Sequence, residues 1–206
     1  MLHRHSPKNF LMHCILACKK MPINLSSKQI SAAIPNVREG LDKYRWLQRQ
    51  VGSGGAFHQD LSFRRRFNHF YRVRRGPEWQ EHFYELMGSA RGKGLTFEFV
   101  LNDLRQATSR FEASFSSKLY ATINPAAPVI DSIVLRNVGL RLPYVGAADR
   151  SARICQVHAA LSSIFDAYLN TRDGAFLVGE FDHAYPFAKD ELTAQKKLDL
   201  VLWQTR

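Results

Sequence analysis

A lysine and an aspartate lie on either side of a short turn bounded by prolines. Lys118 and Asp131 belong to the run FSSKLYATINPAAPVID, residues 115–131, in which Pro125 and Pro128 bracket the turn. Small and apolar residues surround the lysine, and removal of an amine from water disfavours its ammonium form and makes it a better nucleophile. A carboxylate held nearby can orient such an amine and stabilise developing positive charge. We therefore treat this stretch as the candidate catalytic segment.

Both residues also have ordinary structural interpretations. On a helix over residues 113–124, Phe115, Leu119 and Ile123 form the apolar stripe. Lys118 lies about 100° from the centre of that stripe, since a helix has 3.6 residues per turn, and from there its ammonium can extend to water. Asp131 precedes a second apolar run and can serve as the N-cap of a helix. The sequence alone leaves these interpretations open.

The rest of the chain is dominated by helical periodicity, with no alternation of period two and no internal repeat. This pattern predicts an all-α, compact multi-helix domain over residues 21–206, preceded by a poorly ordered extension over residues 1–20. Ser26 or Ser27, Asn36 and Asp149 are expected to cap helices, and Pro77 suits a first helical turn. The expected helices span residues 26–34, 36–51, 60–74, 77–92, 96–111, 113–124, 130–138, 149–170, 175–184 and 189–204.

The charge of the chain is concentrated in its first part. Residues 1–75 contain 15 lysines and arginines against three acids, whereas residues 76–206 contain 14 against 15. A localised positive field attracts a phosphate backbone, although basic residues can also serve only for solubility. We therefore expect a nucleic-acid partner, DNA rather than RNA, and no membrane partner, because no apolar run reaches the length of a membrane helix.

The cysteines and histidines indicate neither a disulfide framework nor a metal site. Three cysteines, Cys14, Cys18 and Cys155, form no framework spacing, which favours a reducing compartment and a cytoplasmic location. The group of His3, His5, His13, Cys14 and Cys18 lacks the paired spacing of a zinc site. There is no phosphate-binding glycine loop and no dinucleotide fingerprint, so we expect no metal and no cofactor.

Residues 63–75 interleave aromatic side chains with arginines. Phe63, Phe67, Phe70 and Tyr71 recur at the spacing of one helix face, which predicts that they are core residues rather than base-stacking residues. The exposed side then carries the candidate phosphate-binding residues, namely Arg64, Arg65, Arg72 and Arg75. Arg64 and His69 also fit the loose R-x4-6-H pattern that resembles the HEPN ribonucleases, but so do Arg153 and His158.

The order of Lys118, Pro125, Pro128, Val129 and Asp131 resembles the catalytic stretch of the helix-hairpin-helix DNA glycosylase superfamily. The likeness covers about residues 95–140 and is greatest to bacterial proteins with an 8-oxoguanine-glycosylase fold. It implies an all-helical fold in which Lys118 is the amine nucleophile and Asp131 the essential carboxylate. The hairpin is degenerate: in place of its glycines, the residues before the lysine read EASFSS, residues 112–117. The interval of 13 positions from the lysine to the aspartate is also shorter than is usual in the family.

Three functions follow as expectations. The first is an N-glycosylase, with or without lyase activity, that acts on a base in nucleic acid or a nucleotide. The second is a non-catalytic nucleic-acid-binding or defence-associated module on the same scaffold. The third is a HEPN-like, metal-independent ribonuclease that uses Arg64 and His69.

Overall fold

The computed structural model describes residues 23–205, and this part of the chain consists of helices and connecting loops without a strand. The predicted all-α class is therefore confirmed. The residue 1–20 extension, with its histidines and two of the cysteines, lies outside the described residues. The helices are α2 (Ser27–Ala33), η1 (Ile34–Val37), α3 (Arg38–Gly52), η2 (Phe57–Gln59), α4 (Leu61–Tyr71), α5 (Pro77–Ala90), α6 (Phe97–Thr108), α7 (Ala113–Ile123), α8 (Ser132–Asn137), α9 (Arg150–Leu169), α10 (Arg172–Ala184), α11 (Ala188–Glu191) and α12 (Ala194–Gln204).

Several helix starts are set by the capping residues that the sequence offers. Ser26 caps α2 in a reciprocal capping box with Gln29, and the Asp60 carboxylate accepts a hydrogen bond from the Ser62 amide at the start of α4. Pro77 occupies the first turn of α5 as predicted. Each of these residues satisfies, or removes, a backbone donor that the first turn of a helix leaves without a partner.

Other predicted boundaries were wrong. Asn36 does not cap α3; its side-chain amide donates to the Ala32 carbonyl, and the chain continues from α2 through η1 into α3 without an extended residue. The arginine-rich helix ends at Tyr71 rather than near residue 74, because Arg72 adopts a left-handed conformation with φ of 54°. That early end leaves Arg74 and Arg75 outside the helix, and Arg74 lines the groove described below.

The C-terminal helices also differ from the prediction. α10 begins at Arg172 under a cap from Thr171, so Gly174 lies inside its first turn rather than in a break. An added Cβ at Gly174 would lie 2.2 Å from the Tyr168 carbonyl oxygen, which explains why a glycine stands there. The single helix expected over 189–204 is two, because Leu192 is extended and Thr193 caps α12.

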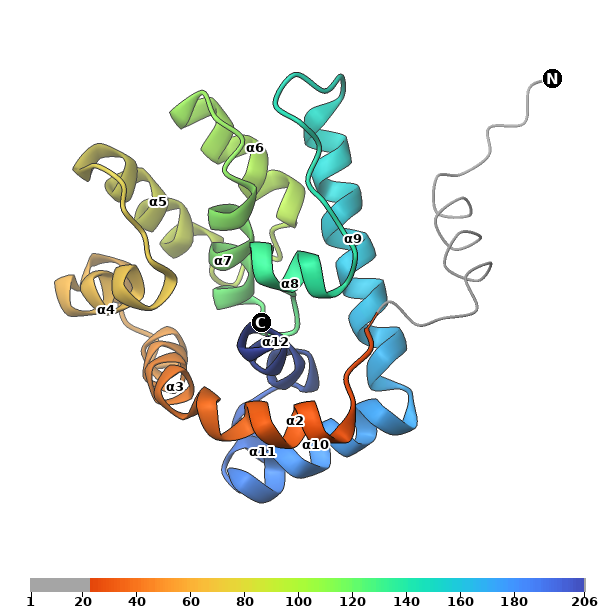
Figure 1. Ribbon diagram of the computed structural model, residues 1–206. Helices are drawn as coiled ribbons and strands as arrows, with labels where there is room; N and C mark the ends of the chain where they lie inside the picture. Colours follow the sequence, from red (N-terminus) through yellow and green to blue (C-terminus); the bar gives the residue numbers. More distant parts are fainter. Residues whose placement is uncertain (1–22, 206) are drawn as a thin grey trace.

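The helices enclose two apolar clusters that meet near α4 and α7. One is formed largely by α2, α8, α9, α10 and α12, and the other by α4, α5, α6 and parts of α3 and α7. Phe70 packs against both clusters. Phe63, Phe67 and Tyr71 are buried, so the predicted core face of α4 is confirmed. Figure 1 shows α7, α8 and α12 in the middle of the molecule, surrounded by the other helices.

None of the helices in residues 23–205 combines the length and the apolar character that crossing a bilayer requires.

Candidate functional site

Helix α7 carries Lys118 into the interior because the helix is buried on more than one side. Ser116 and Ser117 are fully buried, and Ala121 and Thr122 are nearly so. Such small side chains let neighbouring helices approach α7 closely. A long side chain that leaves this helix beside its apolar stripe therefore enters protein rather than open solvent.

The Lys118 amine has few polar neighbours. Its Nζ atom donates to the Tyr71 carbonyl oxygen at 3.3 Å and lies 5.0 Å from the centre of the Phe115 ring. Burial lowers the pKa of the Lys118 ammonium, and the nearby charge of Arg72 lowers it further, while Asp131 and Asp199 act in the opposite direction. The neutral, nucleophilic form of the amine is thus more accessible than on a surface lysine.

Asp131 is the N-cap residue of α8 and lines the pocket that Lys118 also lines. Its Oδ1 atom accepts a hydrogen bond from the Ile133 amide at 2.8 Å, so the predicted N-cap role is present. The preceding turn is attached to α7, because the Ile130 amide donates to the Ser117 hydroxyl at 2.8 Å. This bond fixes the start of α8 next to the residue before Lys118.

Lys118 and Asp131 line one pocket of about 230 Å³, together with residues of α3, α4, α8 and α12. The structure therefore brings the two predicted residues together. Their shared pocket is smaller than the usual range of roughly 300–1,000 Å³ for drug-sized ligands, which is consistent with a compact group such as one ring system.

The α12 side of the pocket carries a second charged pair. Lys196 and Asp199 are both buried, and their charged atoms lie 2.7 Å apart. The ammonium also lies 4.6 Å from the centre of the Tyr44 ring. Burial opposes the charge on Lys196, but Asp199 and the phenols of Tyr71 and Tyr44 offset this and raise its pKa above the ordinary value.

Tyr71 forms part of the wall of this pocket. The residue is 8% exposed and lines the pocket, and its hydroxyl is enclosed in protein near the Thr122 side chain. Burial raises the pKa of this phenol, so it remains a protonated donor at neutral pH.

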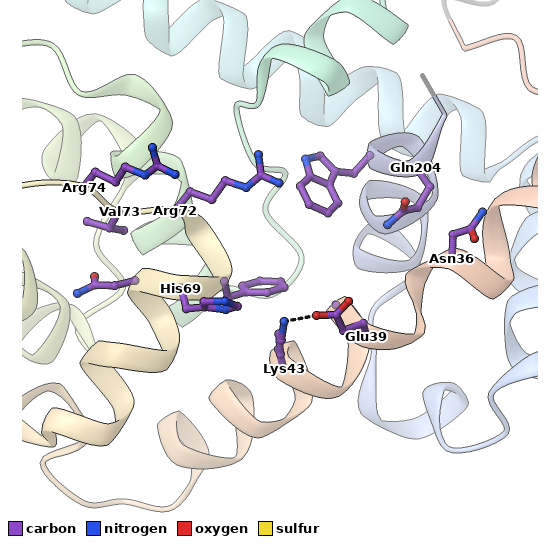
Figure 2. A pocket seen from close by; sticks show the side chains of 12 residues that line it. Asn36, Glu39, Lys43, His69, Arg72, Val73, Arg74 and Gln204 are labelled. Atoms are coloured by element: carbon purple, nitrogen blue, oxygen red, sulfur yellow. Dashed lines mark hydrogen bonds and ion pairs between the residues drawn. The ribbon is translucent and has the colours of Figure 1, made fainter.

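A larger, open groove of about 760 Å³ adjoins the pocket. Five residues, Gly40, Phe70, Arg72, Trp203 and Gln204, line both hollows. Figure 2 shows Arg72 and Arg74 extending along one side of the groove, with His69 near its middle and the Glu39–Lys43 ion pair on α3 across from them. The Arg72 guanidinium lies 5.8 Å from the centre of the Trp203 ring, so this pair forms the boundary between groove and pocket.

The four arginines predicted to contact phosphates divide into two pairs. Arg72 lines the groove, and Arg65 is exposed in a third hollow next to it. Arg64 instead forms a bidentate ion pair with Glu81, and Arg75 pairs with Glu112 at 2.9 Å. The last two arginines are held by carboxylates, which leaves less of their charge for an external anion.

The R-x4-6-H pairs do not form a composite site. Arg64 is directed to Glu81 and to the His58 carbonyl, whereas His69 is exposed and lines the groove. In the second pair, Arg153 is exposed and His158 is buried, with its ring stacked on Phe97 at 4.1 Å. Neither arrangement brings a guanidinium and an imidazole to one cavity.

The connection between α6 and α7 occupies the place where the resemblance implies a phosphate-binding hairpin. It runs from Ser109 to Glu112 and contains no glycine. Glu112 is the N-cap residue of α7, and its carboxylate pairs with Arg75. A carboxylate at this helix end opposes the binding of a second anion there, since helix N-termini otherwise attract phosphate.

Several site residues were not anticipated from the sequence, among them Arg74, Lys196, Asp199 and Trp203. Arg74 was assigned to the helix whose early end now exposes it. Lys196 and Asp199 are three positions apart on α12 and would ordinarily be solvated. A signal was present in the run LDLVLW, residues 198–203, because its apolar residues extend over more than one face of the helix and so indicate burial.

Comparison with protein-family models, with curated proteins and with solved structures found no match to the chain.

Proposed function

We propose that this protein is an N-glycosylase that acts on a nucleobase in nucleic acid, with Lys118 as nucleophile and Asp131 as the stabilising carboxylate. The observation that carries the proposal is the shared pocket: a mostly buried amine with lowered pKa and a carboxylate on one small cavity. The adjoining groove with its exposed arginines supplies a path for a phosphate backbone. The resemblance of residues 95–140 to helix-hairpin-helix glycosylases supports the same assignment.

In the proposed reaction the target nucleoside is turned out of its strand into the pocket. The neutral Lys118 amine attacks the sugar C1′ atom while the bond from C1′ to the base breaks, and the base departs with the bonding electrons and takes up a proton. Asp131 stabilises the positive charge that develops at the sugar. Loss of the amine protons and opening of the sugar ring then give a Schiff base between Lys118 and C1′.

The Schiff base makes the proposal directly testable, because borohydride reduces it to a stable covalent adduct. We expect the wild-type protein to form such an adduct with abasic or oxidised-base DNA, and Lys118→Met to form none. Asp131→Asn should lower the rate of adduct formation ~10²–10³-fold, the usual effect of removing one group that stabilises charge in the transition state. Asparagine is as good an N-cap as aspartate, so this variant separates chemistry from folding.

Lys189→Met is the matched control, because Lys189 is exposed on α11 and away from the pocket. It should form as much adduct as the wild type. Failure of the wild type to form an adduct on any of these substrates would refute the proposal, as would an undiminished adduct with Lys118→Met.

A specific observation favours a second candidate, a nucleic-acid-binding module without catalysis. Asp131 already caps α8, and the Lys118 ammonium already donates to the Tyr71 carbonyl, so both residues have structural roles. This candidate predicts salt-sensitive binding of nucleic acid with no adduct and no base release.

A further inference from the structure

Three hollows on one side of the molecule form a continuous path. The pocket that holds Lys118 opens into the 760 Å³ groove through the residues that both share. The groove in turn shares Lys43 and His69 with a third hollow of about 460 Å³ on the outer faces of α3 and α4. The path therefore leads from the pocket, over the start of α3 and the end of α4, to the surface beside Trp46.

Cations outnumber carboxylates along the groove and the third hollow. Their lining residues include five cations, Lys43, Arg65, Arg66, Arg72 and Arg74, and two carboxylates, Glu39 and Asp42. Glu39 is paired with Lys43. The four arginines are exposed, and none of them forms an ion pair with a carboxylate within the described part of the chain. The path thus offers four guanidinium groups to phosphates.

An aromatic ring stands at each end of this positive path. Trp203, beside the pocket, faces Arg72. Trp46, in the third hollow, carries the Arg66 guanidinium 4.2 Å from its ring centre. Both indoles are partly buried, and Trp46 also stacks on Phe63, so Trp203 is the ring that can receive an unpaired base. Proteins bind single strands by stacking bases on such rings while the backbone follows the charges.

The resemblance to helix-hairpin-helix glycosylases implies a hairpin before α7 that binds a duplex phosphate. In this chain that position carries the Glu112 carboxylate instead. A base in a single strand also enters the pocket without the cost of unpairing, which is a few kcal/mol in a duplex.

We infer that the substrate is single-stranded nucleic acid, threaded along the path from Trp46 to Trp203 with one base in the Lys118 pocket. This inference rests on the proposed function for the reaction, but the binding it describes is measured separately. Arg65, Arg66, Arg72 and Arg74 contact phosphates, and Trp203 stacks on a base that flanks the target.

The test is a binding titration of the full chain carrying Lys118→Met, with a fluorescein-labelled single-stranded DNA of mixed sequence and with the same sequence as a blunt duplex. We expect the single strand to bind at least ~10-fold more tightly. Four phosphate contacts predict a slope of about −2.8 for log K against log salt concentration, which is a ~50-fold loss of affinity between 50 and 200 mM salt.

Two sets of variants locate the strand. The double variant Arg65→Gln/Arg74→Gln should reduce the magnitude of the salt slope by about 1.4; both residues are exposed, so the fold is retained. Trp203→Leu should weaken single-strand binding ~5–150-fold, the range for loss of one stacked base. Lys189→Gln, on the exposed α11, is the matched control and should change neither quantity.

Equal or tighter binding of the duplex would overturn the inference, and so would a salt slope that the arginine variant leaves unchanged. The outcomes distinguish this inference from the proposed function. Adduct formation by the wild type on duplex DNA, without a preference for the single strand, retains the glycosylase and removes the threaded strand. Tight single-strand binding without any adduct retains the strand and removes the glycosylase.

Discussion

The buried pair of Lys196 and Asp199 yields the sharpest stability prediction. Lys196 is 5% exposed, and its Nζ atom donates a hydrogen bond to the Asp199 carboxylate at 2.7 Å. Replacement of Asp199 by alanine leaves the charge of Lys196 in the interior without its counter-ion. What then remains near the ammonium is the phenol of Tyr71 and the Tyr44 ring, whose centre is 4.6 Å away.

Removal of one partner from a buried ion pair costs ~3–5 kcal/mol, because an uncompensated charge remains in the protein. For a chain of this size, each kcal/mol shifts the melting temperature by about 2–4 °C. Asp199→Ala should therefore lower the melting temperature by ~6–20 °C. The double variant Lys196→Met/Asp199→Leu removes both charges and keeps the volume, so it should lie near the wild type or above it.

Thermal and urea unfolding of the wild type, Asp199→Ala and the double variant measure these differences at pH 7. This pH is well below both the unfolded and the raised folded pKa of Lys196, so the stabilisation is fully present; it declines only when the pH rises through the folded pKa. If Asp199→Ala loses less than ~1 kcal/mol, or if the double variant is as unstable as the single one, the ion pair is not buried as described.

Three further predictions concern Lys118, His158 and a glycine pair. Lys118→Met should change the free energy of unfolding by less than ~1.5 kcal/mol, because it conserves volume. Wild-type stability should increase as the pH rises from the lowered folded pKa of Lys118 toward 10.5, and this increase should be absent from the variant. A large loss of stability in chemical denaturation would show that the lysine is structural. Burial lowers the pKa of His158 to about 4. The free energy of unfolding should therefore fall by ~3 kcal/mol as the pH drops from 6.5 to 4, at about 1.36 kcal/mol per pH unit. His158→Phe should flatten this part of the pH profile, and parallel profiles for variant and wild type would contradict the burial of His158. On α10, Gly174→Ala should destabilise the protein by ~1–3 kcal/mol, since the added Cβ would overlap the Tyr168 carbonyl. Gly179→Ala should stabilise it by ~0.5–1 kcal/mol, because an added Cβ there meets no atom within 4 Å. Equal melting temperatures for the two variants would be incompatible with this packing.

Local sequence patterns predicted the helices well wherever one face is buried and the other solvated. The face of α4 that carries Phe63 and Phe67 is an example, since both are fully buried. The same patterns failed for helices that are enclosed. Lys118 was placed beside an apolar stripe and near water, yet α7 is also buried at Ser116 and Ser117, and their small side chains gave no periodic apolar signal.

The pair on α12 shows the same limit more strongly. Three-residue spacing of Lys196 and Asp199 is indistinguishable in sequence from a pair on a solvated helix. What buries the pair is the packing of α12 against α8, α9, α10 and η1, which depends on contacts between residues far apart in the chain. The ends of helices depended on backbone conformation as well. The left-handed Arg72 ends α4 and leaves Arg74 in the groove, and no local propensity predicts this conformation for an arginine.

The charges of the pocket and of the groove imply different tasks for the two hollows. The pocket contains two ammonium and two carboxylate groups, from Lys118, Lys196, Asp131 and Asp199, so its own charges balance except for Arg72 at its mouth. The groove and the third hollow retain an excess of cations. A phosphate is therefore attracted to the groove and gains less from entering the pocket, whereas an uncharged group can enter the pocket without leaving a charge unpaired. A nucleic-acid strand fits this division, because its phosphates and its bases are separate groups that one turned-out nucleotide presents to the two hollows at once.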